Sequence, residues 1–184
     1  TGEIIKGHVS LGSLRIRQDY MIAQALTKDP FISNNQNNQM LELAIARIRQ
    51  LSAHEIGHTI GFAHNFAASA NNRASVMDYP HPLVDIKDDE IVFDDVYDTG
   101  IGDWDKVTVA YSYSHFKADQ NENDELNKIL EDATDNGLRF ISDYDARSLD
   151  GSHAYAHLWD NGETAYSGLD KVIEIRQKAI QNFS

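Results

Sequence analysis

One short motif constrains this chain more than any other feature of its sequence. Residues 54–64 read His-Glu-Ile-Gly-His-Thr-Ile-Gly-Phe-Ala-His. On a helix His54 and His58 are one turn apart on the same face, so both imidazoles can reach one metal ion. A third ligand must come from another direction, and Gly61 permits that bend because a residue without Cβ readily adopts the left-handed conformation that ends helices. His64 then completes a three-histidine zinc site with an open fourth position for water, which is the arrangement of catalytic zinc.

Glu55 follows the first predicted ligand and lies about 100° around the helix from it, beside the metal without ligating it. Its expected role is that of a general base. Zinc lowers the pKa of bound water from about 15.7 towards about 7, so Glu55 can take the proton as the water attacks a polarised carbonyl. The same carboxyl can then protonate the leaving amine. The motif predicts amide hydrolysis, and a degenerate, inactive relative with the same motif is the alternative.

The composition limits the other classes of function. The chain has no cysteine, so any transition-metal site must use His, Asp or Glu. Its formal charge of -13 argues against nucleic acid as a partner, because no excess of cations is available to displace counterions from phosphates. We find no apolar run long enough to span a membrane and no signal peptide. Because the first residue is Thr1 and not Met, we expect the chain to be excised from a longer precursor and to contact the rest of that parent chain.

The spacing of apolar residues, together with the residues that cap or end helices, predicts mostly helical structure. A short strand is expected over 3–12, where β-branched residues alternate loosely between glycines. The polar stretch 34–39 is expected to be a solvated loop that ends in an Asn helix cap. After it, Met40, Leu41, Ala44, Ile45, Ile48, Leu51 and Ser52 mark one long amphipathic helix that runs to about Gly61. Further helices are expected over 14–26, 122–134 and 169–180, with a loop-rich stretch from 142 to 162. Another helix is expected to open at Gly102-Asp103, where Asp103 can cap, with an inward stripe of Trp104, Val107 and Tyr111.

The segment from Asp85 to Asp105 carries nine acidic residues with only Lys87 to balance them. A solvated acidic loop and a Ca²⁺ site are both compatible with this composition, since hard cations favour carboxylate oxygens. Two histidines, His153 and His157, are four residues apart but lie in a segment typical of a loop, which favours structural roles. The histidines at 8, 81 and 115 have no partner at ligand spacing.

A second block, Ser75-Val76-Met77-Asp78-Tyr79-Pro80, follows the histidine motif and is similar to the Met-turn of the metzincin clan of zinc endopeptidases. The resemblance implies that Met77 packs beneath the zinc site without ligating it. It also implies a role for Tyr79, which has the spacing seen in astacins and serralysins, where the tyrosine can bind zinc and swing to stabilise the oxyanion. The alternative is a tyrosine buried in the turn.

More of the chain resembles the large secreted zinc-dependent metalloproteases of Gram-negative bacteria that carry domains of unknown function. This resemblance rests on residues 1–24, on His64-Asn65-Phe66 and on the blocks 137–143 and 156–162. It implies a secreted, periplasmic or outer-membrane-associated bacterial protein. By analogy with the clan, the segment from Ile4 to Leu11 is the edge strand that binds an extended peptide substrate, through Ile5, Gly7, His8 and Val9. An ordinary edge strand is the alternative.

The predicted fold class is α+β, a metzincin-like zincin catalytic core with a long active-site helix, a Met-turn and a mostly helical C-terminal part. Residues 1–184 are expected to form one catalytic domain or a fragment of one. Its parts are an edge strand, a helix and the zinc helix (1–66), the Met-turn and the following helix (67–116), and a helical and loop part (117–184). Because metzincins usually place several strands and helices before this helix, we expect the core to be truncated at its N-terminus.

The predicted function is that of a zinc-dependent endopeptidase with one catalytic Zn²⁺ and a protein or peptide as substrate. A catalytically silent zinc-containing binding or scaffolding module is the alternative from another class. Zinc-dependent hydrolysis of a non-peptide amide is a third.

Overall fold

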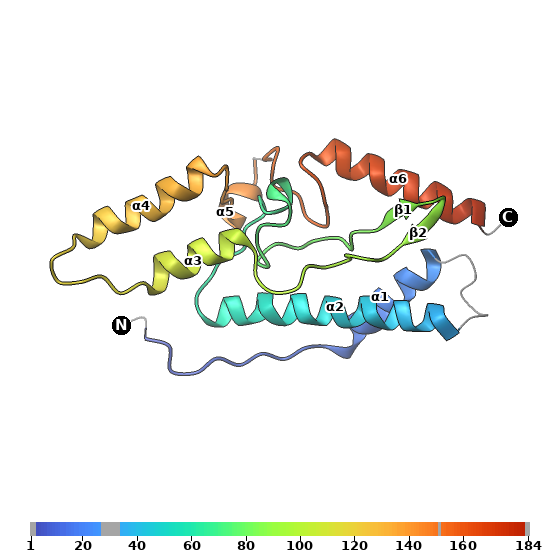
Figure 1. Cartoon of the computed structure of the whole chain (residues 1–184), viewed down its shortest axis with the longest axis horizontal. Coiled ribbons are helices and arrows are strands. Elements are labelled where there is room, and N and C mark those ends of the chain that lie inside the picture. The colour runs from blue at the N-terminus through green and yellow to red at the C-terminus, as the bar shows by residue number, and fades with distance from the viewer. Residues whose placement is uncertain (1–2, 27–33, 151, 183–184) are drawn as a thin grey trace.

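The computed structural model describes residues 3–26, 34–150 and 152–182. Helix α2 runs along the lower edge of Figure 1, with α1 packed against it, α6 and α4 above it, and a small hairpin between α6 and the lower helices. The elements in chain order are α1 (Ser13–Leu26), α2 (Asn34–Thr59), the 3₁₀ turn η1 (Ser69–Asn71), β1 (Asp85–Lys87), β2 (Glu90–Val92), α3 (Asp103–Tyr113), α4 (Glu122–Asp135), α5 (Asp143–Ala146) and α6 (Ala165–Asn182). A mostly helical chain with one small antiparallel sheet confirms the predicted α+β class.

The core joins α1 and α2 to the segment after the hairpin. Its buried members are Ala23, Met40, Leu43, Val96 and Tyr97. Two residues predicted for the apolar face of α2 lie elsewhere, since Leu41 is 51% exposed and Ile45 is 37% exposed. The buried face of α2 is instead the stripe Met40, Leu43, Ala44, Arg47, Gln50, His54 and Gly57. Apolar periodicity located the helix but not the direction from which its neighbour approaches.

The strand predicted over 3–12 is wrong. This segment has no regular secondary structure and passes below α2 in Figure 1. A strand needs the backbone hydrogen bonds of a neighbouring strand, and the sheet of the described chain contains only the pair β1 and β2. The β-branched composition was therefore not sufficient to form one.

The loop predicted over 34–39 is also wrong, because α2 begins at Asn34. Extending an existing helix costs far less than starting one, so polar residues of modest helix propensity can continue the amphipathic segment that follows them. The remainder of the prediction for this helix is confirmed, since α2 ends at Thr59 with a turn at residues 60 and 61.

Part of the acidic segment folds into a hairpin that the sequence did not predict. Ile86 pairs with Ile91, and the two turn residues, Asp88 and Asp89, both have positive φ, at 51° and 66°. This is the backbone conformation of a tight two-residue turn, which Asp tolerates better than most residues. α6 packs on both strands, and its Lys171 and Lys178 each place Nζ 2.6 Å from a hairpin carboxylate, those of Asp85 and Asp89.

The predicted opening of α3 at residues 102–103 is confirmed, but its capping residue and the start of α6 differ from the prediction. Gly102 is the N-cap of α3, and its N–H donates to the Asp105 carboxylate over 2.7 Å, so Asp103 is not the cap. Tyr111, predicted to face inward, is 42% exposed. α6 begins at Ala165, four residues early, because the Thr164 hydroxyl accepts the backbone N–H of Ser167 over 3.1 Å and so caps its first turn.

The predicted helices over 14–26 and 122–134 are confirmed to within one residue. The described residues of the stretch 142–162, which leave out 151, are irregular apart from the single turn of α5. A search of the helices in the described ranges finds none with the length and apolarity that a membrane crossing requires.

Candidate metal centre

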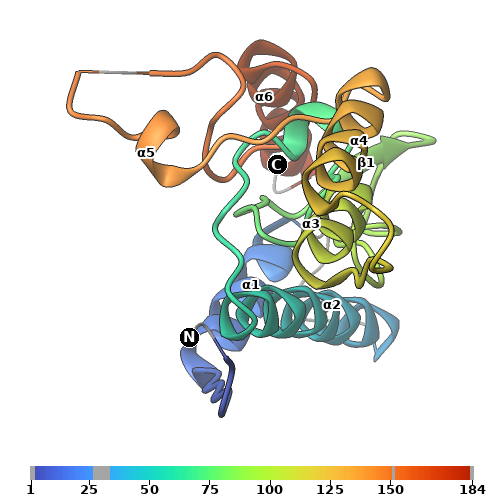
Figure 2. The same ribbon diagram turned by 90° about the vertical axis from the view of Figure 1, so that its left-hand side faces the viewer.

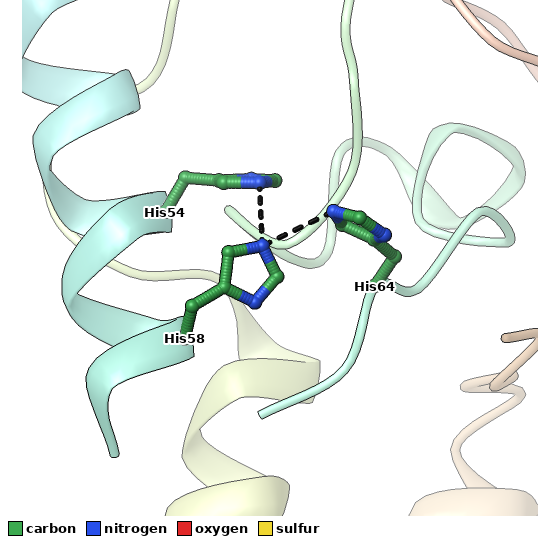
Figure 3. A group of neighbouring side chains, drawn as sticks. All are labelled: His54, His58 and His64. Carbon is green, nitrogen blue, oxygen red and sulfur yellow. Dashed lines mark hydrogen bonds between the residues drawn. The ribbon is translucent and has the colours of Figure 1, made fainter. Parts of the chain in front are cut away.

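Helix α2 carries two of the three predicted ligands, and the third comes from the loop beyond its end. His54 is buried, at 1% exposed, His58 faces solvent and His64 is half-buried. Figure 3 shows the three imidazoles converging, two from the helix and one from the opposite side. The Nε2 atom of His58 lies 3.1 Å from the Nε2 of His54 and 3.1 Å from that of His64.

The other ring nitrogen of each histidine faces a fixed oxygen acceptor. His54 Nδ1–H donates to the Val76 carbonyl over 2.7 Å, and His58 Nδ1–H donates to the Phe62 carbonyl over 2.8 Å. His64 Nδ1 lies 2.7 Å from a carboxylate oxygen of Asp143. An oxygen without a proton can only accept, so each neutral imidazole carries its hydrogen on Nδ1 and leaves its Nε2 lone pair free.

These tautomers determine which kind of group can bind between the three Nε2 atoms. Three unprotonated Nε2 atoms cannot donate to one another, although they are spaced at hydrogen-bond distance. Two nitrogens bound at 2.0–2.1 Å to one tetrahedral ion lie about 3.3 Å apart, close to the observed spacings. The donor set therefore fits a zinc ion held by His54, His58 and His64. In the part of the chain that the structure describes, these three are the one group of at least three His, Asp or Glu side chains whose ligand atoms cluster in this way.

The electrostatics of His54 favour the neutral form that a metal ligand needs. Burial lowers the pKa of His54, and the neighbouring rings of His58 and His64 lower it further. The hydrogen bond to Val76 and the charge of Glu55 act in the opposite direction. The net direction is downward from the ordinary value.

The bend predicted at Gly61 is present. Gly61 has φ of 95°, and the Phe62 N–H donates back to the Gly57 carbonyl over 3.0 Å. This reversal ends α2 and turns the chain so that His64 approaches from outside the helix.

Met77 is buried, at 3% exposed, and packs against the turn of α2 that carries the ligands. Its neighbour on α2 is Gly57, one residue before His58. A Cβ added at Gly57 would overlap the Met77 Sδ and would lie 3.3 Å from its Cε. The second x of the His-Glu-x-x-His motif is therefore constrained in this chain, because only glycine leaves room for the methionine.

A buried carboxylate that the sequence did not assign to the site, Asp105, holds the Met-turn in place. Asp105 accepts the Ser75 hydroxyl over 2.6 Å, the Val76 N–H over 2.8 Å and the Gly102 N–H over 2.7 Å. The carbonyl of the same Val76 accepts from His54. Asp105 thus acts on the metal centre through a single residue, and its place in the first turn of a helix gave no local signal of this.

Tyr79 lies against the ligands. Its ring centroid is 5.1 Å from that of His54 and 4.7 Å from that of His64, and on another side Trp159 packs 5.5 Å away. The Trp159 N–H donates to the Tyr79 carbonyl over 2.8 Å. Burial raises the pKa of the Tyr79 phenol, and the charges of Asp143 and Glu55 raise it further, so the phenol keeps its proton at neutral pH.

Glu55 is half-buried between the first ligand and the solvent. Its charge raises the pKa of both His54 and Tyr79, which places the carboxylate within electrostatic reach of a ligand and of the phenol.

The N-terminal residues predicted to bind substrate do not form the expected strand, but they do lie beside the end of α2. A Cβ at Gly7 would be 3.0 Å from the Thr59 Cβ. Ile5 is 95% exposed, and His8 Nε2 lies 3.1 Å from the Ser10 hydroxyl oxygen. The roles of Ile5, Gly7, His8 and Val9 in substrate binding stay predictions.

The predicted calcium site gains no support. Several carboxylates of the acidic segment are paired with Lys or Arg, including cations from outside it. Arg73 binds Asp98 over 2.6 Å, Lys87 binds Asp94 over 2.6 Å, and α6 supplies the two lysines described above. His153 and His157 lie in the irregular stretch before α6, where His153 Nδ1 accepts the Tyr155 N–H over 3.2 Å.

The α+β fold, the converging histidines and the methionine beneath them define a metzincin-like zincin core. A family model described as Met-zincin matches residues 36–184, and the chain belongs to that family. Searches of curated proteins and of solved structures returned no match.

Proposed function

We propose that this chain is a zinc-dependent endopeptidase that hydrolyses peptide bonds in a protein or peptide substrate. The observation that carries the proposal is the convergence of three Nε2 atoms whose partner Nδ1 atoms all face acceptors. Such a centre uses three protein ligands and leaves a coordination position open, as catalytic zinc requires. His58 is exposed, so the centre can be reached from solvent.

When bound, zinc supplies Lewis-acid polarisation of a carbonyl and lowers the pKa of a water molecule. Glu55 accepts the proton of that water and delivers it to the leaving amine. Its position next to His54 on α2 supports this role, because a residue about 100° around the helix from a ligand can stand beside the metal without ligating it. A general base of this kind contributes about 10²- to 10⁴-fold in rate.

Tyr79 is proposed to donate its phenolic hydrogen bond to the carbonyl oxygen as negative charge develops there. Two observations support this role: its ring packs against His54 and His64, and its raised pKa keeps the donor protonated. Donors that act only on developing charge are typically worth about 10²- to 10³-fold in kcat.

The test compares zinc content and cleavage of a peptide library for the wild type, Glu55→Gln and Tyr79→Phe. Zinc is expected at one ion per chain in all three, with hydrolysis lost in Glu55→Gln and reduced in Tyr79→Phe. Glu42→Gln is the matched control, because Glu42 is an exposed carboxylate on the same helix.

A wild type that binds zinc but cleaves no peptide would favour the scaffolding alternative and overturn the peptidase proposal. A wild type that binds no zinc would overturn the site itself. Cleavage that Glu55→Gln leaves intact would remove Glu55 from the mechanism.

A further inference from the structure

The segment 139–143 is bound to the residues that follow the third ligand, although 74 or more positions separate them in the chain. Asn65 is fully buried, and its side-chain amide donates to the Arg139 carbonyl over 2.9 Å. Its Oδ1 accepts the Ile141 N–H over 3.1 Å, and the Phe66 N–H donates to the Ile141 carbonyl over 2.9 Å. We call this set of three hydrogen bonds the 65–141 strap.

The strap lies directly before α5 in the chain and holds the start of that helix beside the third ligand. Asp143 is the first residue of α5, two positions after Ile141, and its Oδ2 lies 2.7 Å from His64 Nδ1. His64 directly precedes Asn65 at one end of the strap, and Asp143 closely follows Ile141 at the other end. The strap therefore holds the ligand and the carboxylate next to each other. Figure 2 shows α5 projecting from the body formed by the other helices.

The third ligand needs this support more than the other two. The backbones of His54 and His58 are fixed by α2, whereas His64 lies in an irregular stretch between Gly61 and the buried Asn65. The acceptors also differ, since His54 and His58 donate to neutral backbone carbonyls and His64 faces a carboxylate. A hydrogen bond to an ionised acceptor is roughly twice as strong as a neutral one, and it makes the opposite ring nitrogen a better ligand.

We propose that Asp143 is a positioning residue of the metal centre, which holds the His64 ring with Nε2 towards the ion and strengthens that nitrogen as a ligand. The proposal rests on the proposed function only in taking zinc as the ion that the three histidines bind. It gives a role to the block around residues 137–143, to which the sequence resemblance assigned none.

A surface ion pair without a metal-directed role makes a different prediction. The side chains of His64 and Asp143 are 17% and 49% exposed, and exposed pairs contribute little to folding stability. Loss of Asp143 should therefore change the unfolding temperature of the zinc-free protein very little. Orientation of a ligand acts on metal affinity instead, where loss of such a partner typically costs 10- to 100-fold.

The experiment measures zinc affinity by competition with a chromophoric chelator, together with the visible absorption spectrum of the Co²⁺-substituted protein. The variants are Asp143→Ala, Asp143→Asn and the control Asp145→Asn, which removes an exposed carboxylate from the same turn of helix. Asp143→Ala is expected to bind zinc about 10- to 100-fold more weakly and to shift the cobalt bands. Asp143→Asn, which keeps an acceptor oxygen, should lose less, and Asp145→Asn should match the wild type.

Zinc affinities of Asp143→Ala and wild type within twofold of each other, with the same cobalt spectrum, overturn the proposal. If Asp143→Ala does not fold, as judged by circular dichroism without metal, Asp143→Asn decides by the same criterion. A wild type that binds zinc but cleaves nothing overturns the proposed peptidase activity. The role of Asp143 is then still decided by the zinc affinities of the variants. A wild type that binds no zinc overturns both.

Discussion

Gly57 and Met77 pack so closely beside the metal centre that a single methyl group added to Gly57 would overlap the Met77 sulfur. Because Gly57 has no side chain, the turn of α2 that carries His54 and His58 packs directly against the Met77 side chain. The contact joins the histidine motif to the Met-turn through two residues that are 20 positions apart in the sequence.

Gly57→Ala is therefore expected to destabilise the chain. Overpacking typically costs about 1–3 kcal/mol, while Ala gains about 1 kcal/mol over Gly in a helix. Because Met77 is buried and has little room to move, we expect the clash to exceed the gain. Denaturant unfolding measures the difference, and Gly12→Ala, where a Cβ meets no atom within 4 Å, is the control.

The sign should reverse once the sulfur is removed. In a Met77→Ala background the clash is absent and the helix propensity remains, so the added Gly57→Ala change should stabilise. An effect of Gly57→Ala that is the same in both backgrounds would contradict the proposed contact.

Gly61→Ala tests the bend in a different way. At Gly61 a Cβ meets no atom within 4 Å, so the cost comes only from the positive φ of 95°. The left-handed conformation costs a residue with a Cβ about 1–2 kcal/mol. We expect an unfolding free energy lower by about that amount and a weaker zinc affinity. Gly61→Asn, which tolerates this conformation better, should lose less, and equal losses would point to a cause other than backbone strain.

Asp105→Ala should have the largest effect on stability of the variants considered. It leaves the Ser75 hydroxyl and the backbone N–H groups of Val76 and Gly102 without their acceptor. A buried donor without a partner costs about 1–3 kcal/mol, so a loss of several kcal/mol in thermal unfolding is expected. Asp103→Asn, which removes only a surface pair with Lys106, should change stability by less than about 1 kcal/mol. Similar losses in the two variants would contradict the role of Asp105.

Asp78 predicts a pH dependence of stability. Burial raises the pKa of Asp78 to about 7, helped by the nearby charge of Asp160 and opposed by its hydrogen bonds from the Tyr79 and Ser69 N–H groups. Between pH 4 and 7 the folded chain binds a proton here that the unfolded chain has released. The free energy of unfolding contributed by Asp78 therefore falls as pH rises through this window and levels off above about pH 7.

Asn resembles the protonated carboxyl but does not titrate, so Asp78→Asn should lack this contribution. Chemical unfolding of the zinc-free protein at pH 5 and pH 8 checks it, and the difference between wild type and variant removes the histidine titrations common to both. Parallel pH profiles in the two proteins would show that Asp78 is ionised throughout.

The parts of the site that the sequence predicted are those encoded by local spacing. The positions of His54, His58 and Gly61 follow from helix geometry and from the conformational freedom of glycine, and these required no knowledge of the rest of the fold. Met77 and Tyr79 came from a second local block recognised by resemblance.

The parts that could not be predicted depend on contacts between distant segments. Asp105 and Asp143 are two acidic side chains among 29, and only the folded chain shows which ones reach a ligand. The same holds for the hairpin, where Asp88 and Asp89 look like part of a charge run until the strands on either side pair. In the N-terminal segment, by contrast, the sequence predicted a strand that does not form. Strand-like composition is not sufficient where no neighbouring strand is available to pair with.

The three oxygens that orient the histidines belong to Phe62, Val76 and Asp143, which lie at the end of α2, in the Met-turn and in the segment after α4. An ion bound by the three histidines would be a non-covalent cross-link between α2 and the loop that carries His64, and the same histidines hold the Met-turn and the segment after α4 through their hydrogen bonds. In a sequence without cysteine, it takes the part that a disulfide plays in other small domains, by restricting the unfolded chain more than the folded one. Removing the ion should then lower the unfolding temperature of the chain, and adding the ion back should restore it.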